Sequence, residues 1–192
     1  MSHLPAVVAL LILFTGSVAA TDEPDRAKPE RSAQGEAPAL REAGWLQSIR
    51  LEPHGVRVTA KLDTGAKSSA IHATDVERFE RGGVERVKFS LFQKHTDQDG
   101  TKITYDLPIA GKVRIKRAAE KVTDDRITVR LSFCIDGELM DAEFSLDDRS
   151  NLNYPVLLGR EFLAQHFLVN SAKTFVFGHD CPQPAPKPAG KN

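Results

Sequence analysis

The sequence predicts an all-β protein, a small barrel with one or two short helices. Apolar and polar residues alternate from Val56 to Leu62 and again from Val129 to Ile135, which is the period of a half-buried strand. The chain shows no βαβ rhythm and no long amphipathic helix, so a doubly wound parallel sheet is not expected. The two short segments with a helical pattern are Asp75 to Glu80 and Arg160 to His166.

Turn signals join the other strands in pairs. Asp136-Gly137 separates two alternating runs, so Thr128 to Leu146 is expected to form a hairpin. In the same way, Val87 to Phe92 and Lys102 to Leu107 flank a turn at Asp97 to Gly100. Such closely spaced strands favour a barrel built from antiparallel hairpins.

Length and charge narrow the class of protein. The chain has 192 residues, of which 41% are hydrophobic and 27% charged, which suits one ordinary globular domain. Its 26 Lys and Arg residues balance 26 Asp and Glu residues. Nucleic-acid binding usually needs a basic excess, so a DNA or RNA partner is not expected.

The N-terminus is typical of an exported protein. The first twenty residues contain no Asp, Glu, Lys or Arg, and the apolar run from Ala6 to Phe14 is shorter than the roughly 20 residues that span a bilayer. Residues 1–20 are therefore predicted to be a signal peptide, cleaved before Thr21, with a buried core helix or a non-cleaved anchor as the alternative. Export would give a periplasmic or secreted protein with no stable membrane span after cleavage.

Composition divides the remaining chain into three parts. Residues 21–43 are rich in charged residues, Pro and Ala, and are predicted to be a flexible leader. Residues 44–180 form the predicted folded domain. Residues 181–192 are Pro-rich with no packing face and are predicted to be a disordered tail.

The two cysteines are far apart in the sequence. An oxidising compartment would permit Cys134 and Cys181 to pair, and the bridge would stabilise the fold by roughly 4 kcal/mol. Two unpaired thiols are the alternative. The spacing excludes a Cys-x-x-Cys redox or zinc site.

Several common devices of catalysis are absent. The sequence has no triphosphate-binding Gly-x-x-x-x-Gly-Lys-Ser/Thr loop, no dinucleotide fingerprint, no Gly-x-Ser-x-Gly elbow and no His-Glu-x-x-His zinc helix. The six histidines are scattered, and each is better explained as a surface or hydrogen-bonded core residue than as a metal ligand. No cofactor and no metal site are therefore expected.

Two segments could carry chemistry. The strand that ends at Leu62 runs directly into Asp63-Thr64-Gly65-Ala66, which places a carboxylate at the end of a buried strand beside a glycine. Asp63 could be a catalytic acid, or it could simply close an Asx-turn before Gly65. The second segment, Tyr154 to Leu163, begins about 95 residues later. A short apolar strand is expected at its start, and this strand ends at Gly159-Arg160, where a helix begins.

Together, Ala60 to Ala73 and Tyr154 to Leu163 resemble the retropepsin-like aspartic peptidases. More narrowly, they are similar to a bacterial family labelled ATP-dependent zinc proteases and associated with ATP-grasp peptide ligases. The resemblance covers roughly Gly44 to Phe177 and implies a small closed acid-protease barrel. The absent zinc helix and triphosphate loop give the zinc and ATP labels no support. A metal-dependent hydrolase, as the family label says, is a third hypothesis.

The resemblance also implies a mechanism. Aspartic peptidases use two carboxylates that share one proton, because two like charges about 3 Å apart cannot both ionise. This chain has a single Asp-Thr/Ser-Gly motif, so a dyad would need Asp63 from each of two chains on a two-fold axis. The function implied is a periplasmic aspartic endopeptidase that acts on peptide or peptide-like amide bonds of a peptide or protein substrate as a homodimer.

Individual roles follow from the same resemblance. Thr64 would bond across the dimer axis, Gly65 would offer its N–H to the carboxylate, and Ala66 would line the floor of the site. Gly159 and Arg160 would form a structural strand-to-helix element under this loop, with Arg160 in a buried ionic contact.

The flap is where this chain departs from the family pattern. It would enter at Val113 to Ile115 and leave at Ile127 to Val129, and its tip, within Lys116 to Arg126, is charged and lacks the usual Ser and Gly residues. His72 matches the family pattern and is assigned to the structure or the rim of the site. The altered tip leaves a second hypothesis open, a non-catalytic barrel that binds peptides or envelope partners.

Overall fold

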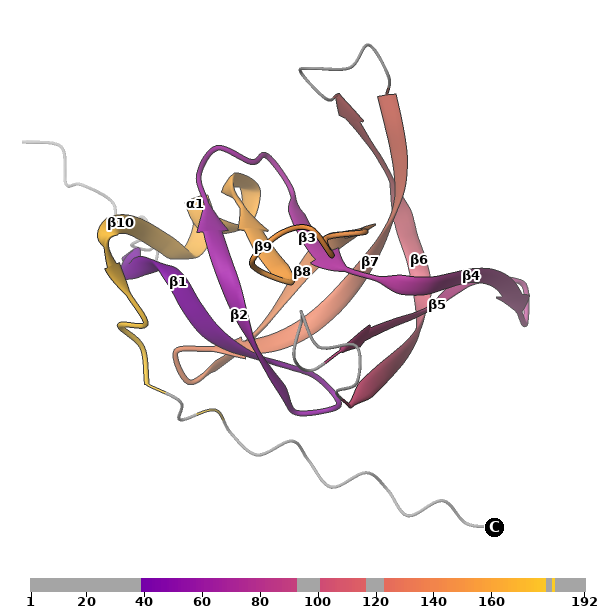
Figure 1. Ribbon diagram of the computed structural model, residues 1–192, viewed down its shortest axis with the longest axis horizontal. Coiled ribbons are helices and arrows are strands. Elements are labelled where there is room, and N and C mark those ends of the chain that lie inside the picture. Colours follow the sequence, from indigo (N-terminus) through magenta and orange to yellow (C-terminus); the bar gives the residue numbers. More distant parts are fainter. Residues whose placement is uncertain (1–38, 93–100, 117–122, 179–180, 182–192) are drawn as a thin grey trace, which may run out of the picture. The chain divides into compact units, whose positions relative to one another are not determined.

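The structure is a computed structural model that describes residues 39–92, 101–116, 123–178 and 181. It confirms the all-β fold class (Figure 1). The expected signal peptide and most of the expected leader and tail lie outside these residues. The elements are β1 (Arg41–Leu51), β2 (Val56–Asp63), β3 (Ser69–His72), β4 (Thr74–Arg81), β5 (Val84–Phe92), β6 (Lys102–Lys116), β7 (Thr123–Ile135), β8 (Glu138–Asp147), β9 (Val156–Gly159), α1 (Arg160–His166) and β10 (Phe167–Thr174).

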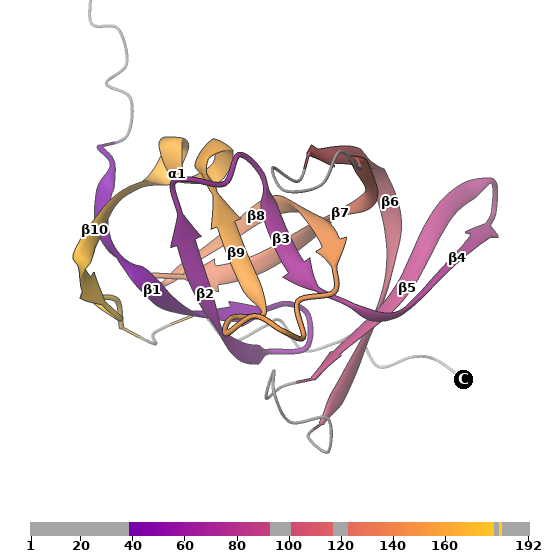
Figure 2. The same ribbon diagram turned by 45° about the horizontal axis from the view of Figure 1, so that its top comes forward.

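Six of the strands close into a barrel. The hydrogen-bonded order is β1-β2-β9-β3-β8-β7, and β7 returns to β1 through the pairs Arg50 with Cys134 and Leu51 with Phe133. β10 lies parallel to β1 outside this ring (Figure 2). β1 begins at Arg41 and Ala43 is fully buried, so the first strand extends into the segment assigned to the leader.

The barrel is filled by the apolar faces of alternating strands. In β2, Val56, Val58, Ala60 and Leu62 are buried while the residues between them are not, as the sequence pattern predicts. Phe133 and Phe144 meet edge to face at 5.8 Å, and Phe133 also contacts Phe162 of the helix at 5.4 Å. This core fixes the direction in which the polar face of β2 points.

The predicted hairpin from Thr128 to Leu146 is confirmed. β7 and β8 are antiparallel, and Ile135 pairs with Glu138 across the two-residue turn Asp136-Gly137. Both turn residues have positive φ, at 52° and 76°, which is the backbone conformation that Asp-Gly favours in such turns. The second predicted pair is also confirmed, since β5 pairs with β6, although its turn lies outside the described residues.

The predicted helix from Asp75 to Glu80 is wrong, because this segment is β4. It pairs with β5 around the turn Gly82-Gly83, whose φ values of 60° and 76° match a two-residue hairpin turn. None of the β4 side chains is fully buried. The few apolar residues of β4 were spaced as in a helix, but they do not pack into the core, so their spacing did not indicate a helix. β4 and β5 form a ribbon that reaches away from the barrel, as Figures 1 and 2 show.

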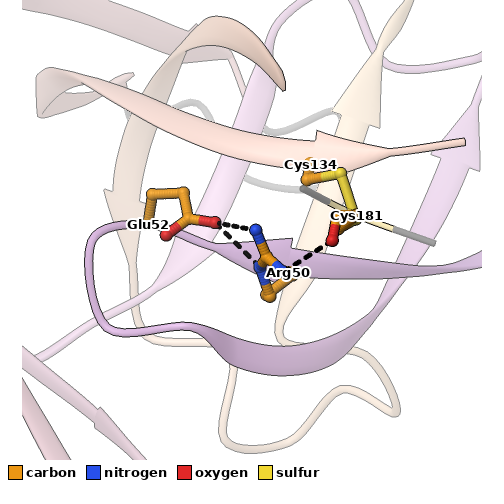
Figure 3. The surroundings of a disulfide bond; sticks show 4 residues. All are labelled: Arg50, Glu52, Cys134 and Cys181. Atoms are coloured by element: carbon orange, nitrogen blue, oxygen red, sulfur yellow. Dashed lines mark hydrogen bonds and ion pairs between the residues drawn. A yellow bond between two sulfur atoms is a disulfide. The ribbon is translucent and has the colours of Figure 1, made fainter. Parts of the chain in front are cut away.

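The end of the barrel where β2 begins is closed by a disulfide. Cys134 of β7 and Cys181 are bonded, with their Cα atoms 5.9 Å apart (Figure 3). The Arg50 guanidinium beside this bond donates to the Cys181 carbonyl at 3.3 Å and pairs with Glu52 at 2.8 Å. Of the two alternatives left by the sequence, the structure therefore has the bridge.

Candidate functional site

Asp63 is the last residue of β2 and lies at the opposite end of that strand from the disulfide. It pairs with Gly159 in a parallel ladder between β2 and β9. Because side chains alternate along a strand, Leu62 enters the core while Lys61 and Asp63 share the other face. The core of the barrel thus presents the Asp63 carboxylate at the open end of the strand.

Both carboxylate oxygens of Asp63 have a donor. The Gly65 N–H donates to Oδ1 at 3.0 Å, and the Lys61 ammonium lies 3.0 Å from Oδ2. The Gly65 contact is the one implied by the peptidase resemblance, and it is equally the contact of an Asx-turn, so it does not separate the two explanations of Asp63. Partial burial raises the pKa of Asp63, but the hydrogen bonds from Lys61 and Gly65 and the Lys61 charge outweigh it, so this pKa lies below its ordinary value.

The loop after Asp63 rests on the start of the helix. The backbone N–H groups of Arg160 and Glu161 donate to the carbonyls of Ala66 at 2.8 Å and Lys67 at 3.0 Å. Gly159 allows this approach, since a Cβ at that position would lie 2.4 Å from the Ser68 backbone. The strand-to-helix element therefore supports the loop directly.

Arg160 differs from the expectation in one respect. The sequence analysis placed it in a buried ionic contact, but its side chain is exposed and donates to the neutral Thr64 carbonyl at 3.1 Å. As the first residue of α1, it points away from the core toward the loop. Its contact with the loop is a hydrogen bond to the backbone.

His72 belongs to the structure of the barrel. His72 is only 3% exposed, and its Nδ1 accepts a hydrogen bond from the backbone N–H of Arg149 at 3.0 Å. The His72 N–H in turn donates to the Pro155 carbonyl at 2.7 Å. His72 thereby fixes both ends of the segment between β8 and β9, which forms one wall of the candidate site.

A pocket of about 440 Å³ opens beside Asp63. Arg149 is 6% exposed and donates to the Tyr154 carbonyl at 3.2 Å, and the rings of Trp45 and Tyr154 meet edge to face at 6.0 Å. Burial lowers the pKa of Arg149, and the Asp147 and Asp63 carboxylates act in the opposite direction, so Asp63 is within electrostatic reach of this guanidinium. The pocket is lined by Trp45, Lys61, Asp63, Arg149, Leu152, Asn153, Tyr154 and Leu157.

A second cavity, of about 510 Å³, lies between the Asp63 loop and the expected flap. The flap arms are confirmed as strands, since β6 and β7 pair from Ile109 with Val129 to Lys116 with Thr123. Most of the expected tip, residues 117–122, lies outside the described residues. Ala66 lines this cavity, with four basic residues around it: Lys67, Arg114, Arg126 and Arg149.

The basic residues Lys61 and Arg149 were missed from the sequence. The sequence could have indicated Lys61, because residues two apart on a strand share a face and Lys61 precedes Asp63 by two. No sequence pattern could have indicated Arg149, since only the fold brings the β8–β9 segment to the end of β2. Thr64 is exposed, and the contact predicted for it needs a second chain. In the part of the chain that the structure describes, no group of three His, Cys, Asp or Glu side chains is arranged to hold a metal ion, and no helix is long and apolar enough to cross a membrane.

Comparison with known families agrees with this geometry. The family model described as "RimB-like: Retropepsin-like aspartic endopeptidase RimB" matches residues 43–179, most of the chain and nearly all of the described barrel. The chain belongs to this RimB-like family. The resemblance inferred from the two segments is thereby confirmed, as is the retropepsin-like barrel that it implied.

The chain is also similar to part of several longer proteins. Proteins named "Probable alpha-L-glutamate ligase" from Desulfotalea psychrophila and Shewanella pealeana are each 28% identical, over 121 and 123 residues, and a third from Parasynechococcus marenigrum is 26% identical over 113 residues. The matches cover 63%, 63% and 59% of this chain but only 26%, 26% and 24% of the relatives, so the chain spans about a quarter of their length.

A solved structure shares the fold. A protein of unknown function from Legionella pneumophila superposes with a TM-score of 0.61 at 25% identity. The match covers 72% of this chain and 98% of that protein. The barrel thus accounts for nearly all of that protein.

Proposed function

We propose that the protein is a periplasmic aspartic endopeptidase in which Asp63 and the Asp63 of a second copy of the chain activate a water molecule. The observation that carries the proposal is the position of Asp63, a partly exposed carboxylate whose loop is supported by the first residues of α1 and which opens into a pocket. A turn-closing aspartate would need the Gly65 contact alone. The supported loop and the pocket favour catalysis.

The chemistry requires one proton on the pair of carboxylates. The ionised carboxylate takes a proton from water as the water oxygen attacks the peptide carbonyl, while the protonated carboxyl donates to the carbonyl oxygen. The tetrahedral intermediate then breaks its C–N bond as the nitrogen receives a proton from the dyad. One water is consumed, and an acid and an amine are released.

The second carboxylate comes from a second chain in this proposal. The sequence contains one Asp-Thr-Gly, and Thr64 is exposed next to Asp63, where it can bond to the equivalent loop of a two-fold partner. The β6–β7 hairpin of each copy would cover the cleft. Homodimerisation is thus part of the mechanism.

The site favours an acidic substrate. Lys61 and Arg149 line the pocket at Asp63. The cavity under the flap is lined by one carboxylate, Asp147, and by four basic residues, Lys67, Arg114, Arg126 and Arg149. Complementary charge would attract peptides that carry carboxylates. Several relatives are named α-L-glutamate ligases, so we propose glutamate-rich peptides as the substrate class.

The test is cleavage of glutamate-rich peptides and of an unfolded neutral protein, from acid to neutral pH, by the protein and its Asp63→Asn variant. We expect cleavage of the acidic peptides by the first and none by the second. Asp75→Asn removes an exposed carboxylate in the β4–β5 ribbon and is the matched control. Cleavage retained by Asp63→Asn would end the aspartic-peptidase proposal.

Light scattering tests the dimer. We expect two copies per particle when a transition-state inhibitor of aspartic peptidases is bound. A protein that stays monomeric with the inhibitor bound contradicts the shared dyad. A folded protein that binds acidic peptides but cleaves none at any pH would favour the non-catalytic barrel instead.

A further inference from the structure

Lys61 is in direct contact with the proposed catalytic carboxylate. Its ammonium lies 3.0 Å from Asp63 Oδ2, the oxygen that Gly65 does not occupy. The contact follows from the strand, because Lys61 and Asp63 are two residues apart on the same face of β2. The Lys61 side chain is 40% exposed, so its ammonium has open space to move into.

This ion pair opposes the proposed chemistry. A dyad works with one shared proton, whereas a cation at each Asp63 favours loss of that proton. The pKa of Asp63 is already below its ordinary value in the single chain, despite the partial burial that raises it. In a two-fold dimer, two Lys61 ammonium groups would act on the same pair of carboxylates and lower the pKa of the shared proton, so that a smaller fraction of the dyad carries the proton that it must donate to the substrate carbonyl.

The adjoining pocket offers Lys61 another partner. It combines the Lys61 ammonium and the Arg149 guanidinium with walls formed by Trp45, Tyr154 and Leu157. Two cations above an apolar wall suit a carboxylate carried on a short aliphatic arm. Asp63 lines the same pocket, so a carboxylate bound there competes with Asp63 for Lys61.

We propose that this pocket is a subsite for an acidic side chain of the substrate, and that the bound carboxylate draws Lys61 away from Asp63 so that the dyad takes up its shared proton from solvent. The inference rests on the proposed peptidase function and adds regulation of the catalytic dyad by the substrate. An acidic residue in the subsite would bind Lys61, and the dyad would then take up the proton that catalysis needs. A neutral residue would leave Lys61 on Asp63 and the dyad ionised.

Among the charged groups near Asp63 that the structure describes, Lys61 is the one that is free of other anchoring contacts in the proposed movement. Asp63 is faced by Lys61 from β2, by Arg149 and Tyr154 from the segment between β8 and β9, and by the Gly65 N–H. Arg149 is buried and anchored by the Tyr154 carbonyl and by Asp147, which lies 3.8 Å away. The side chain of Arg160 is directed to the Thr64 carbonyl.

The first test needs no catalysis. The pKa of the Asp63 carboxyl is measured by NMR titration in the protein and in Lys61→Met, a substitution that keeps the length of the side chain and removes its charge. We expect Lys61→Met to raise this pKa by about one unit, since loss of a nearby opposite charge disfavours the carboxylate. Lys88→Met, which removes an exposed lysine from β5, should leave it unchanged. An Asp63 pKa that does not rise in Lys61→Met would overturn the inference, whatever the protein cleaves.

The second test compares two pH profiles. The profile of kcat/KM reports the free enzyme and that of kcat reports the enzyme–substrate complex. With a peptide that places Glu in the subsite, the alkaline limb of kcat should lie about one pH unit above that of kcat/KM, because bound substrate has freed Asp63 from Lys61. With the matched Gln peptide the two limbs should coincide at the lower pH. Because a glutamate side chain titrates at about pH 4.3, close to this limb, a peptide with cysteic acid in place of Glu serves as the control, since its sulfonate stays ionised throughout.

The variants complete the design. In Lys61→Met both limbs should coincide at the higher pH, and the preference for Glu over Gln should fall about tenfold, which corresponds to one pKa unit. Lys61→Arg keeps the charge and should retain the separation of the limbs. Equal limbs for the Glu and Gln peptides in the unmodified protein would reject the switch while leaving the peptidase proposal standing. Cleavage retained by Asp63→Asn would reject the peptidase proposal together with the switch that rests on it, and the NMR result would then report only the effect of Lys61 on the pKa of Asp63.

Discussion

The two ends of β2 are built in different ways. Near Val56, the Cys134–Cys181 bond joins β7 to the C-terminal segment, beside the buried pair of Arg50 and Glu52 (Figure 3). At the other end, Asp63 stands on a loop held by backbone hydrogen bonds and by close packing against Gly159. The first end is closed by a covalent bond and buried charge, whereas the second keeps its charge accessible.

This difference shows how the fold separates stability from chemistry. In the proposed peptidase, the Asp63 carboxylate must meet substrate and cannot be buried, and the barrel supports its loop through backbone hydrogen bonds while the side chain stays partly exposed. The stabilising contacts that require burial are at the far end. Substitutions at the two ends should therefore affect stability and the site to different extents.

Removal of the disulfide should have the largest effect on stability. Cys134→Ala with Cys181→Ala is expected to lower the free energy of unfolding by about 4 kcal/mol, because the bond closes a long loop in the unfolded chain. Denaturant unfolding measures the loss. Under native conditions, the pKa of Asp63 should not change. A change in this pKa would show that the two ends are coupled.

Glu52→Gln should cost somewhat less. It leaves the buried Arg50 guanidinium without its anionic partner Glu52, and loss of one member of a buried pair typically costs about 3 kcal/mol. Thermal unfolding beside Glu138→Gln, whose carboxylate is well exposed, gives the matched comparison. Equal melting temperatures for the two variants would contradict the importance of the buried pair.

Gly159→Ala should destabilise the fold by about 2 kcal/mol and also disturb the site. The new Cβ would lie 2.4 Å from the backbone of Ser68, so the Asp63 loop must shift. Gly111→Ala in β6 is the control, because there the nearest atom would be the Thr128 hydroxyl at 3.4 Å. We expect the NMR signals of Thr64 and Gly65 to move in the first variant only. Unmoved signals in Gly159→Ala would show that the helix does not hold the loop.

Arg160→Met should have the smallest effect, about 1 kcal/mol. It removes one exposed hydrogen bond to the Thr64 carbonyl and leaves the backbone bonds of Ala66 and Lys67 intact. Hydrogen exchange of the loop amides should become faster while global stability changes little. A large global loss would instead indicate the buried role that the sequence analysis gave to Arg160.

Local patterns explain which parts of the fold could be predicted. The strand from Val56, the Asp136-Gly137 hairpin and the helix at Arg160 each carry their signal within a few residues. β4 was missed because its apolar residues face no core, and Gly82-Gly83 was the turn signal that should have outweighed their spacing.

The candidate site shows the same division. Asp63 and Gly159 were found because each belongs to a recognisable motif. Arg149 reaches the pocket only through the pairing of β9 with β2 and β3, which brings a distant segment to the end of β2. No local pattern reports such a contact. The error over Arg160 has a similar cause, since its sequence neighbours do not reveal which way the first residue of a helix points.

The support of the Asp63 loop by α1 also sets an order of events during synthesis. Arg160 follows Thr64 by 96 residues, and Gly159 follows Ser69 by 90. Contacts between residues so far apart in the sequence form slowly and late in folding. An emerging chain therefore carries its Asp-Thr-Gly segment long before it has the helix that holds the loop in place. Until Arg160 and Glu161 have been made, the loop after Asp63 lacks the hydrogen bonds that hold it in the folded protein.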